Sequence, residues 1–208
     1  MLPQFSRAGN FEPKLYTGGG MRFYLPLLHD IVASEKPALI VTFDLGGAQA
    51  HLTFCQTAAQ HNISSTCAAI RRATVDENAA DDPSWWQRAQ KAAVEFFPTI
   101  SQLIDGGSTT EFSDGLVNVL LMDDVDSAET IRLELELWSP KLSSDALVML
   151  HGLDLERTDP PRGACSAFLK EKAAGEFHNG IGLGIATNRA EMKSSPQRWG
   201  KATNWSPI

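Results

Sequence analysis

The sequence predicts a doubly wound, mostly parallel α/β sheet flanked by helices, and three observations indicate this fold class. Short continuous apolar runs, such as VNVLLM at 117–122, are typical of central strands that are buried on both faces. Helical patterns separate these runs, and strands that alternate with helices build parallel sheets with right-handed crossovers. A length of 208 residues with 43% apolar content suits one domain of this kind.

The first half of the chain supplies the first helices and strands. A helix is expected over 22–34, with one apolar face (Phe23, Leu27, Leu28, Ile31). The run ALIVTFDL at 38–45 predicts the first buried strand, which Gly46 and Gly47 end. A helix over 51–61 and a short strand over 65–70 follow, and a second helix runs over 84–97, bounded by Ser84 and Pro98. Residues 100–104 are ambiguous.

The second half continues the alternation after the strand at 117–122. A helix is expected from Ser127, a good capping residue, to about Trp138, with Glu129 in its first turn. A buried strand over 146–150 ends at His151, a helix is expected over 164–174, and a last strand over 182–186. The predicted organisation is an N-terminal extension over 1–20, an α/β domain over 21–187 and a polar C-terminal tail over 188–208.

Composition narrows the classes of partner. A net charge of −7 and the lack of a basic stripe argue against nucleic acid or an anionic membrane surface. Three cysteines at unrelated spacings predict neither a disulfide framework nor a zinc site. The first residues have no continuous apolar core typical of a signal peptide, and nothing approaches a membrane span in length. We therefore expect a soluble cytoplasmic domain that acts on a small molecule; the sequence does not indicate its oligomeric state.

The turn after the first strand is a candidate cofactor site. Asp44, Gly46, Gly47 and Ala48 follow the strand and precede a helix, so the backbone can approach a ligand closely and the helix N-terminus favours negative charge. The alternative is a strand-to-helix turn that only needs small residues. A dinucleotide site would also want an acidic residue after the second strand, where Arg71 and Arg72 stand instead; these suit a phosphate or a plain surface.

Polar residues also follow two later strands. Asp123, Asp124 and Asp126 come directly after the strand at 117–122, and their carboxylates could hold Mg²⁺, although capping of the next helix by Asp126 or Ser127 is the alternative. His151 ends the strand over 146–150. An imidazole can take up a proton near neutral pH, so His151 is the candidate general base; otherwise it is a hydrogen-bonded histidine at the sheet edge.

Two longer stretches carry a resemblance to a known family. These are Phe112–Gly152 and FHNGIGLGI at 177–185, and the matching positions are Asp123, Trp138, Pro140, Lys141, Leu142 and His151. In them, and over roughly 17–186, the chain resembles class I S-adenosylmethionine-dependent methyltransferases, in the branch associated with bacterial glycosyltransferases. The resemblance implies a Rossmann-like methyltransferase fold and methyl transfer to a sugar or related metabolite in glycan biosynthesis. It places S-adenosylmethionine at Asp44, Gly46, Gly47, Ala48 and Asp123, with His151 and Asp126 catalytic.

The chain departs from that branch at several polar positions. Arg71 stands where a ribose-binding acid is usual, Asp126 where a histidine is usual, and Gly152 where an aspartate is usual. These changes leave open a catalytically degenerate, methyltransferase-like binding module. A second alternative treats Asp124-Val125-Asp126 as the metal-binding motif of a nucleotide-sugar glycosyltransferase.

Overall fold

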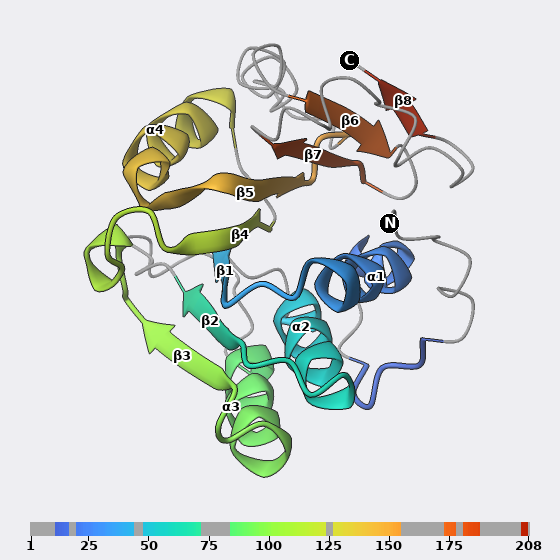
Figure 1. The fold of residues 1–208 in the computed structure, drawn as a ribbon. Helices are drawn as coiled ribbons and strands as arrows, with labels where there is room; N and C mark the ends of the chain where they lie inside the picture. The colour runs from blue at the N-terminus through green and yellow to red at the C-terminus, as the bar shows by residue number, and fades with distance from the viewer. Residues whose placement is uncertain are drawn as a thin grey trace.

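The computed structural model describes residues 11–16, 20–43, 48–71, 84–123, 127–154, 173–177, 181–187 and 205–207. Their strands form one sheet in the order β3-β2-β1-β4-β5-β7-β6-β8 (Figure 1). The strands are β1 (Leu39–Phe43), β2 (Thr66–Arg71), β3 (Ser101–Asp105), β4 (Val117–Met122), β5 (Leu142–His151), β6 (Ala173–Phe177), β7 (Leu183–Thr187) and β8 (Trp205–Pro207). The pairings from β3 to β5 are parallel, and β7 runs antiparallel to both β5 and β6. The predicted mostly parallel, doubly wound sheet is confirmed.

Helices cover both faces of this sheet. They are α1 (Leu25–Glu35), α2 (Gln49–Gln60), α3 (Ser84–Phe96) and α4 (Ala128–Trp138), with short 3-10 turns η2 (Gly20–Phe23), η3 (Thr109–Glu111) and η4 (Ser139–Lys141). Alternate residues of β4 point to opposite faces. Val119 and Leu121 join the core under α1 and α2, whereas Leu120 and Met122 join the core under α4, together with Trp138.

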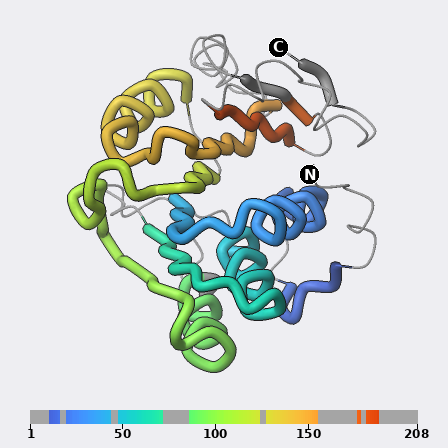
Figure 2. The backbone as a smooth tube through the Cα atoms, viewed as in Figure 1, coloured from blue at the N-terminus to red at the C-terminus, as the bar shows by residue number. Residues whose placement is uncertain are grey.

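The chain reverses its direction across the sheet between β1 and β4. It moves outward from β1 to β2 and β3, then returns to place β4 on the other side of β1 (Figure 2). In open α/β sheets a ligand crevice lies at the carboxyl ends of the strands at such a reversal. The ends of β1, β4 and β5 are therefore where a site is expected. Among the described helices, none combines the length and apolar character needed to cross a membrane.

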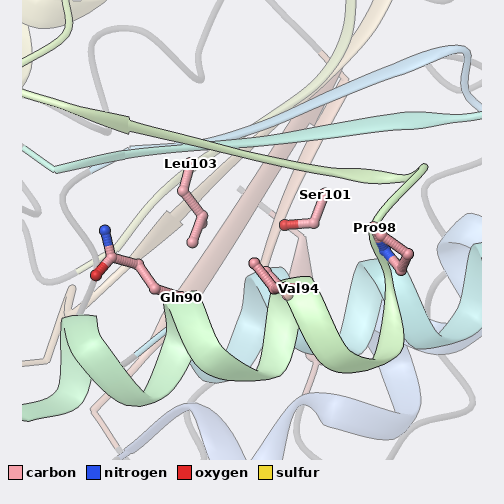
Figure 3. A pocket seen from close by; sticks show the side chains of 6 residues that line it. Gln90, Val94, Pro98, Ser101 and Leu103 are labelled. Atoms are coloured by element: carbon pink, nitrogen blue, oxygen red, sulfur yellow. The ribbon is translucent and has the colours of Figure 1, made fainter.

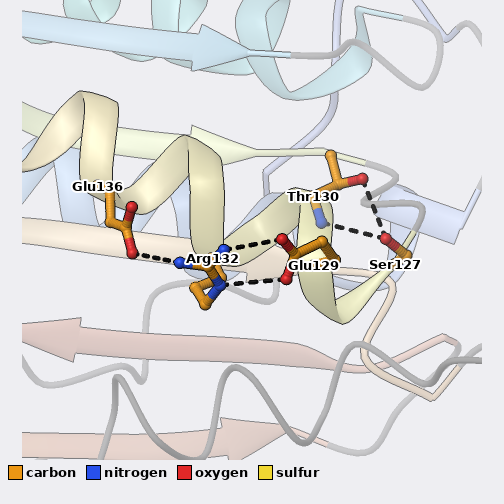
Figure 4. A network of polar contacts seen from close by, with 5 residues as sticks. All are labelled: Ser127, Glu129, Thr130, Arg132 and Glu136. Carbon is orange, nitrogen blue, oxygen red and sulfur yellow. Dashed lines mark hydrogen bonds and ion pairs between the residues drawn. The ribbon is translucent and has the colours of Figure 1, made fainter.

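The start of α4 confirms the predicted cap. The Ser127 hydroxyl accepts a hydrogen bond from the Thr130 backbone N–H at 3.1 Å, which satisfies one of the free donors of the first turn. Glu129 in that turn bonds Arg132, which also bonds Glu136 at 2.6 Å on the exposed side of the helix (Figure 4). The cap at Ser127 therefore determines where α4 begins after β4.

Several element predictions need correction. The first helix begins at Leu25 rather than 22, so Tyr24 is buried and Phe23, expected in the core, is 49% exposed. The ambiguous segment at 100–104 forms edge strand β3, and β5 starts at Leu142, four residues before the expected strand. The helix expected over 164–174 falls largely outside the described residues, but 173–174 belong to β6. Residues 205–207, in the predicted tail, pair with β6 as β8; the domain boundaries stay predictions.

Candidate active site

Asp123 and His151 lie side by side at the carboxyl end of the sheet. Met122 pairs with Leu150, so the next residue on each strand falls at the same edge, and the Asp123 N–H continues the ladder by donating to the Phe43 carbonyl at 2.9 Å. Both side chains project from the face covered by α1 and α2, since they are two residues beyond Leu121 and Met149. The sequence placed both residues at strand ends but did not predict their contact.

The two side chains form a short, buried hydrogen bond. Nδ1 of His151 lies 2.6 Å from Oδ1 of Asp123, and the side chains are only 3% and 2% exposed. A carboxylate accepts hydrogen bonds, so in the neutral imidazole the proton is on Nδ1 and Nε2 carries a lone pair. His151 Nε2 is buried and has no hydrogen-bond partner in the described structure. The pair therefore presents one oriented, unpartnered base atom.

Tyr24 and Gly20 form the wall around this histidine. The Tyr24 ring meets the imidazole edge to face, with centroids 5.5 Å apart. Burial raises the pKa of Tyr24 to about 12, so its phenol stays neutral, and its hydroxyl donates to the Phe177 carbonyl at 3.4 Å. A Cβ at Gly20 would come within 3.5 Å of His151 Cε1 and 3.1 Å of Ile181, so the backbone passes close to the ring. Neither residue was predicted as part of a site: the helical pattern placed Phe23 inward instead of Tyr24, and Gly20 fell in the predicted N-terminal extension.

The predicted cofactor turn is only partly described. Asp44, Gly46 and Gly47 lie outside the described residues, and their assignment stays a prediction. Ala48 is fully buried, begins α2 as its N-cap and has a φ of 61°, a left-handed conformation that L-residues rarely adopt. On the strand that leads into this turn, the Thr42 hydroxyl near the end of β1 is buried without a hydrogen-bond partner.

At the end of β2, Arg71 is already engaged. Its guanidinium makes a two-pronged ion pair with Asp105, at 2.8 and 2.7 Å, and lies 5.2 Å from the centre of the Trp86 ring. Trp86 itself packs against Ala69 and Leu103, and is 4% exposed. These contacts favour the surface interpretation of Arg71 over phosphate binding. Arg72 lies outside the described residues.

The predicted cation site stays a prediction. Asp124 and Asp126 lie outside the described residues, so neither the metal role of the cluster nor the catalytic role of Asp126 is tested. Within the described ranges, no group of three or more histidine, cysteine, aspartate or glutamate side chains is arranged to hold a metal ion. Asp123, the described member of the cluster, directs Oδ1 to His151.

A second buried histidine, His51, contacts Ser101 at the amino end of β3, away from the carboxyl ends of the strands. His51 Nε2 lies 2.7 Å from Ser101 Oγ, and Ser101 lines a cavity of about 310 Å³ between α3 and β3 (Figure 3). Burial lowers the pKa of His51 to about 4, and its Nδ1 has no hydrogen-bond partner. A neutral, weakly basic imidazole without an orienting carboxylate lacks what activation of a serine nucleophile requires. Of the two pairs, the one at Asp123 has the arrangement of a catalytic base.

The strand order, with β7 antiparallel between β5 and β6, is that of the Rossmann-like methyltransferase fold, and solved structures agree. The methyltransferase PaMTH1 from Podospora anserina, solved with S-adenosylhomocysteine, is 8% identical with a TM-score of 0.60, over 88% of this chain and 84% of its own. The O-methyltransferase TomG from Streptomyces achromogenes, involved in tomaymycin synthesis and solved with S-adenosylmethionine, is 12% identical with a TM-score of 0.56, over 88% of both chains.

A methyltransferase from Geobacter sulfurreducens is 18% identical with a TM-score of 0.56, over 88% of this chain and 85% of its own. At such identities the likeness shows a shared fold. No protein-family model matches the sequence, and a search of curated proteins found no match to it. The resemblance to the glycosyltransferase-associated branch stays a prediction.

Proposed function

We propose that the chain is an S-adenosylmethionine-dependent methyltransferase that methylates a hydroxyl oxygen of a sugar or a related small metabolite. The observation that carries the proposal is the Asp123–His151 pair, with its unpartnered Nε2, at the carboxyl ends of two central strands in a methyltransferase fold. A hydroxyl oxygen that gains a methyl group must lose its proton. A histidine with an oriented lone pair is suited to accept that proton.

Asp123 acts in this proposal as a positioning residue. Its carboxylate holds the Nδ1 proton of His151, so that Nε2 faces the acceptor, and it stabilises the imidazolium that forms when Nε2 takes up the acceptor proton. Tyr24, neutral and packed on the ring edge, helps to keep the imidazole in place. The cofactor contact that the sequence suggested for Asp123 stays a prediction beside this role.

The described residues at the end of β1 fit the cofactor. When bound, S-adenosylmethionine supplies an electrophilic methyl group on its sulfonium sulfur. Ala48 makes no side-chain cap at the start of α2, and the helix dipole favours a negatively charged group such as a carboxylate at this end of the helix. The buried, unpartnered hydroxyl of Thr42 provides a further polar contact. With Asp44, Gly46 and Gly47, these groups would hold the cofactor.

The test is transfer of a radiolabelled methyl group from S-adenosylmethionine to a panel of sugars and hydroxylated metabolites. We expect the native protein to label at least one hydroxyl acceptor. His151→Gln should lower the rate on the order of 10²- to 10⁴-fold, the usual contribution of a general base, while cofactor binding persists. Unchanged transfer in His151→Gln would refute the assigned base. A folded protein that binds no cofactor would instead favour the catalytically degenerate binding module. No described contact favours that module over an enzyme, and the fold does not favour a glycosyltransferase.

A further inference from the structure

Two imidazoles meet at the surface where α1 and α2 pack together. His29 lies on α1, and His61 is the C-cap of α2. Their Nε2 atoms are 3.1 Å apart, and their ring centroids are 5.1 Å apart at an angle of 57°. His61 is exposed, so the space beside these nitrogens is open to solvent. This pair plays no part in the proposed methyl transfer.

A buried carboxylate orients one of these rings. Asp30 Oδ1 lies 3.1 Å from His29 Nδ1, and Asp30 is 7% exposed. Because the carboxylate accepts, the proton of neutral His29 is on Nδ1 and the lone pair of Nε2 points toward His61. The Phe11 ring, 4.9 Å from the His29 ring, packs against it. A carboxylate behind a histidine is the usual support for a metal-ligating imidazole in proteins.

We propose that His29 and His61 form a binding site for Zn²⁺, in which the two Nε2 atoms are the protein ligands and water completes the coordination. Zinc binds histidine nitrogen at about 2.0–2.1 Å, and two ligands of a tetrahedral ion at that distance are about 3.3 Å apart. The observed separation of 3.1 Å therefore needs only a small adjustment. Imidazole ligands select zinc and related transition ions over Mg²⁺ or Ca²⁺.

The surrounding charges are compatible with a bound cation. His61 lies at the C-terminus of α2, where the free carbonyl groups give the helix end a partial negative charge. Asp30 supplies the negative charge behind the pair. A bound ion would connect α1 to α2.

The alternative to a zinc site is a plain hydrogen bond between the two imidazoles, in which His61 Nε2–H donates to His29 Nε2. In that case the pair has no affinity for metal. Calorimetric titration of the tag-free, chelator-treated protein with Zn²⁺ separates these cases. We expect one saturable site, loss of binding by at least tenfold in His61→Gln, and unchanged binding in Gln60→Ala, an exposed neighbour on the same helix. Zn²⁺ should also raise the melting temperature of the native protein but not of His61→Gln.

Two results would overturn the proposal: no heat of binding with the native protein, or the same zinc affinity in His61→Gln. Because His61 is exposed, its substitution should leave the fold intact, and the melting temperature without metal checks this. His29→Gln tests the second ligand and should weaken zinc binding equally. None of these outcomes depends on whether the protein binds S-adenosylmethionine.

Discussion

The buried His51 makes a quantitative prediction about stability and pH. Its side chain is completely buried in α2, and burial lowers its pKa from 6.5 to about 4 in the folded protein. In the unfolded chain the ring is exposed and titrates near 6.5. Between these values the unfolded chain binds a proton that the folded protein does not, so stability falls as the pH is lowered.

The size of this effect follows from the gap between the two pKa values, which is about 2.5. At 1.36 kcal/mol per pH unit, the free energy of unfolding falls by about 3 kcal/mol from pH 7 to pH 4 because of His51 alone. Above pH 6.5 both states are neutral, and the contribution no longer changes. In His51→Gln, where the amide can still reach Ser101, this part of the pH dependence should disappear.

Urea unfolding, followed by tryptophan fluorescence at several pH values between 4 and 7.5, measures the effect. The stability difference between the native protein and His51→Gln should shrink by about 3 kcal/mol as the pH falls through this window. The control is Cys55→Ser, which perturbs the same buried cluster, 3.5 Å from His51 Nε2, but keeps the histidine. Its curve should run parallel to that of the native protein. A His51→Gln curve that also runs parallel would refute the reasoning.

Substitutions at three further positions test other parts of the structure. Lys36, the exposed C-cap of α1, has a φ of 48°, a left-handed conformation that glycine adopts without strain. Lys36→Gly should therefore raise the free energy of unfolding by about 1 kcal/mol, whereas Lys36→Ala should not. Thermal melting of the two variants measures this difference. Ser127→Ala removes the side-chain cap of α4 and should lower the free energy of unfolding by about 1 kcal/mol, whereas Ser127→Asp should keep the cap. Equal melting temperatures for Ser127→Ala and the native protein would argue against a stabilising cap. Asp123→Asn should slow methyl transfer on the order of 10²-fold or more, measured by transfer of the radiolabelled methyl group. Cofactor binding, measured by calorimetry, should persist. A rate equal to that of the native protein would show that Asp123 has no role in the mechanism.

The frame of the fold could be predicted from the sequence because apolar patterns determine which strands are central. The run at 117–122 is buried on both faces, and its predicted bounds are those of β4. Strands with polar ends were predicted less well. β3 is an edge strand with the sequence SQLID, and β5 starts with the polar segment LSSD, so neither pattern shows continuous burial.

The candidate site could be located from the sequence but not assembled. Asp123 and His151 were both predicted at strand ends, yet their hydrogen bond depends on the register between β4 and β5, which one sequence does not specify. Tyr24 was missed because residues Gly20–Phe23 form a 3-10 turn and not the first turn of α1, so Tyr24 is buried and Phe23 is exposed. The pairing of Arg71 with Asp105 likewise depends on the parallel register of β2 and β3.

The central claim is that this fold binds S-adenosylmethionine, and calorimetric titration tests it most directly. The native protein would be titrated with S-adenosylmethionine and S-adenosylhomocysteine, with and without Mg²⁺, beside Asp44→Arg and His151→Gln. We predict saturable binding to the native protein and to His151→Gln, and none to Asp44→Arg at an unchanged melting temperature. No binding of either compound to the folded native protein would contradict the account.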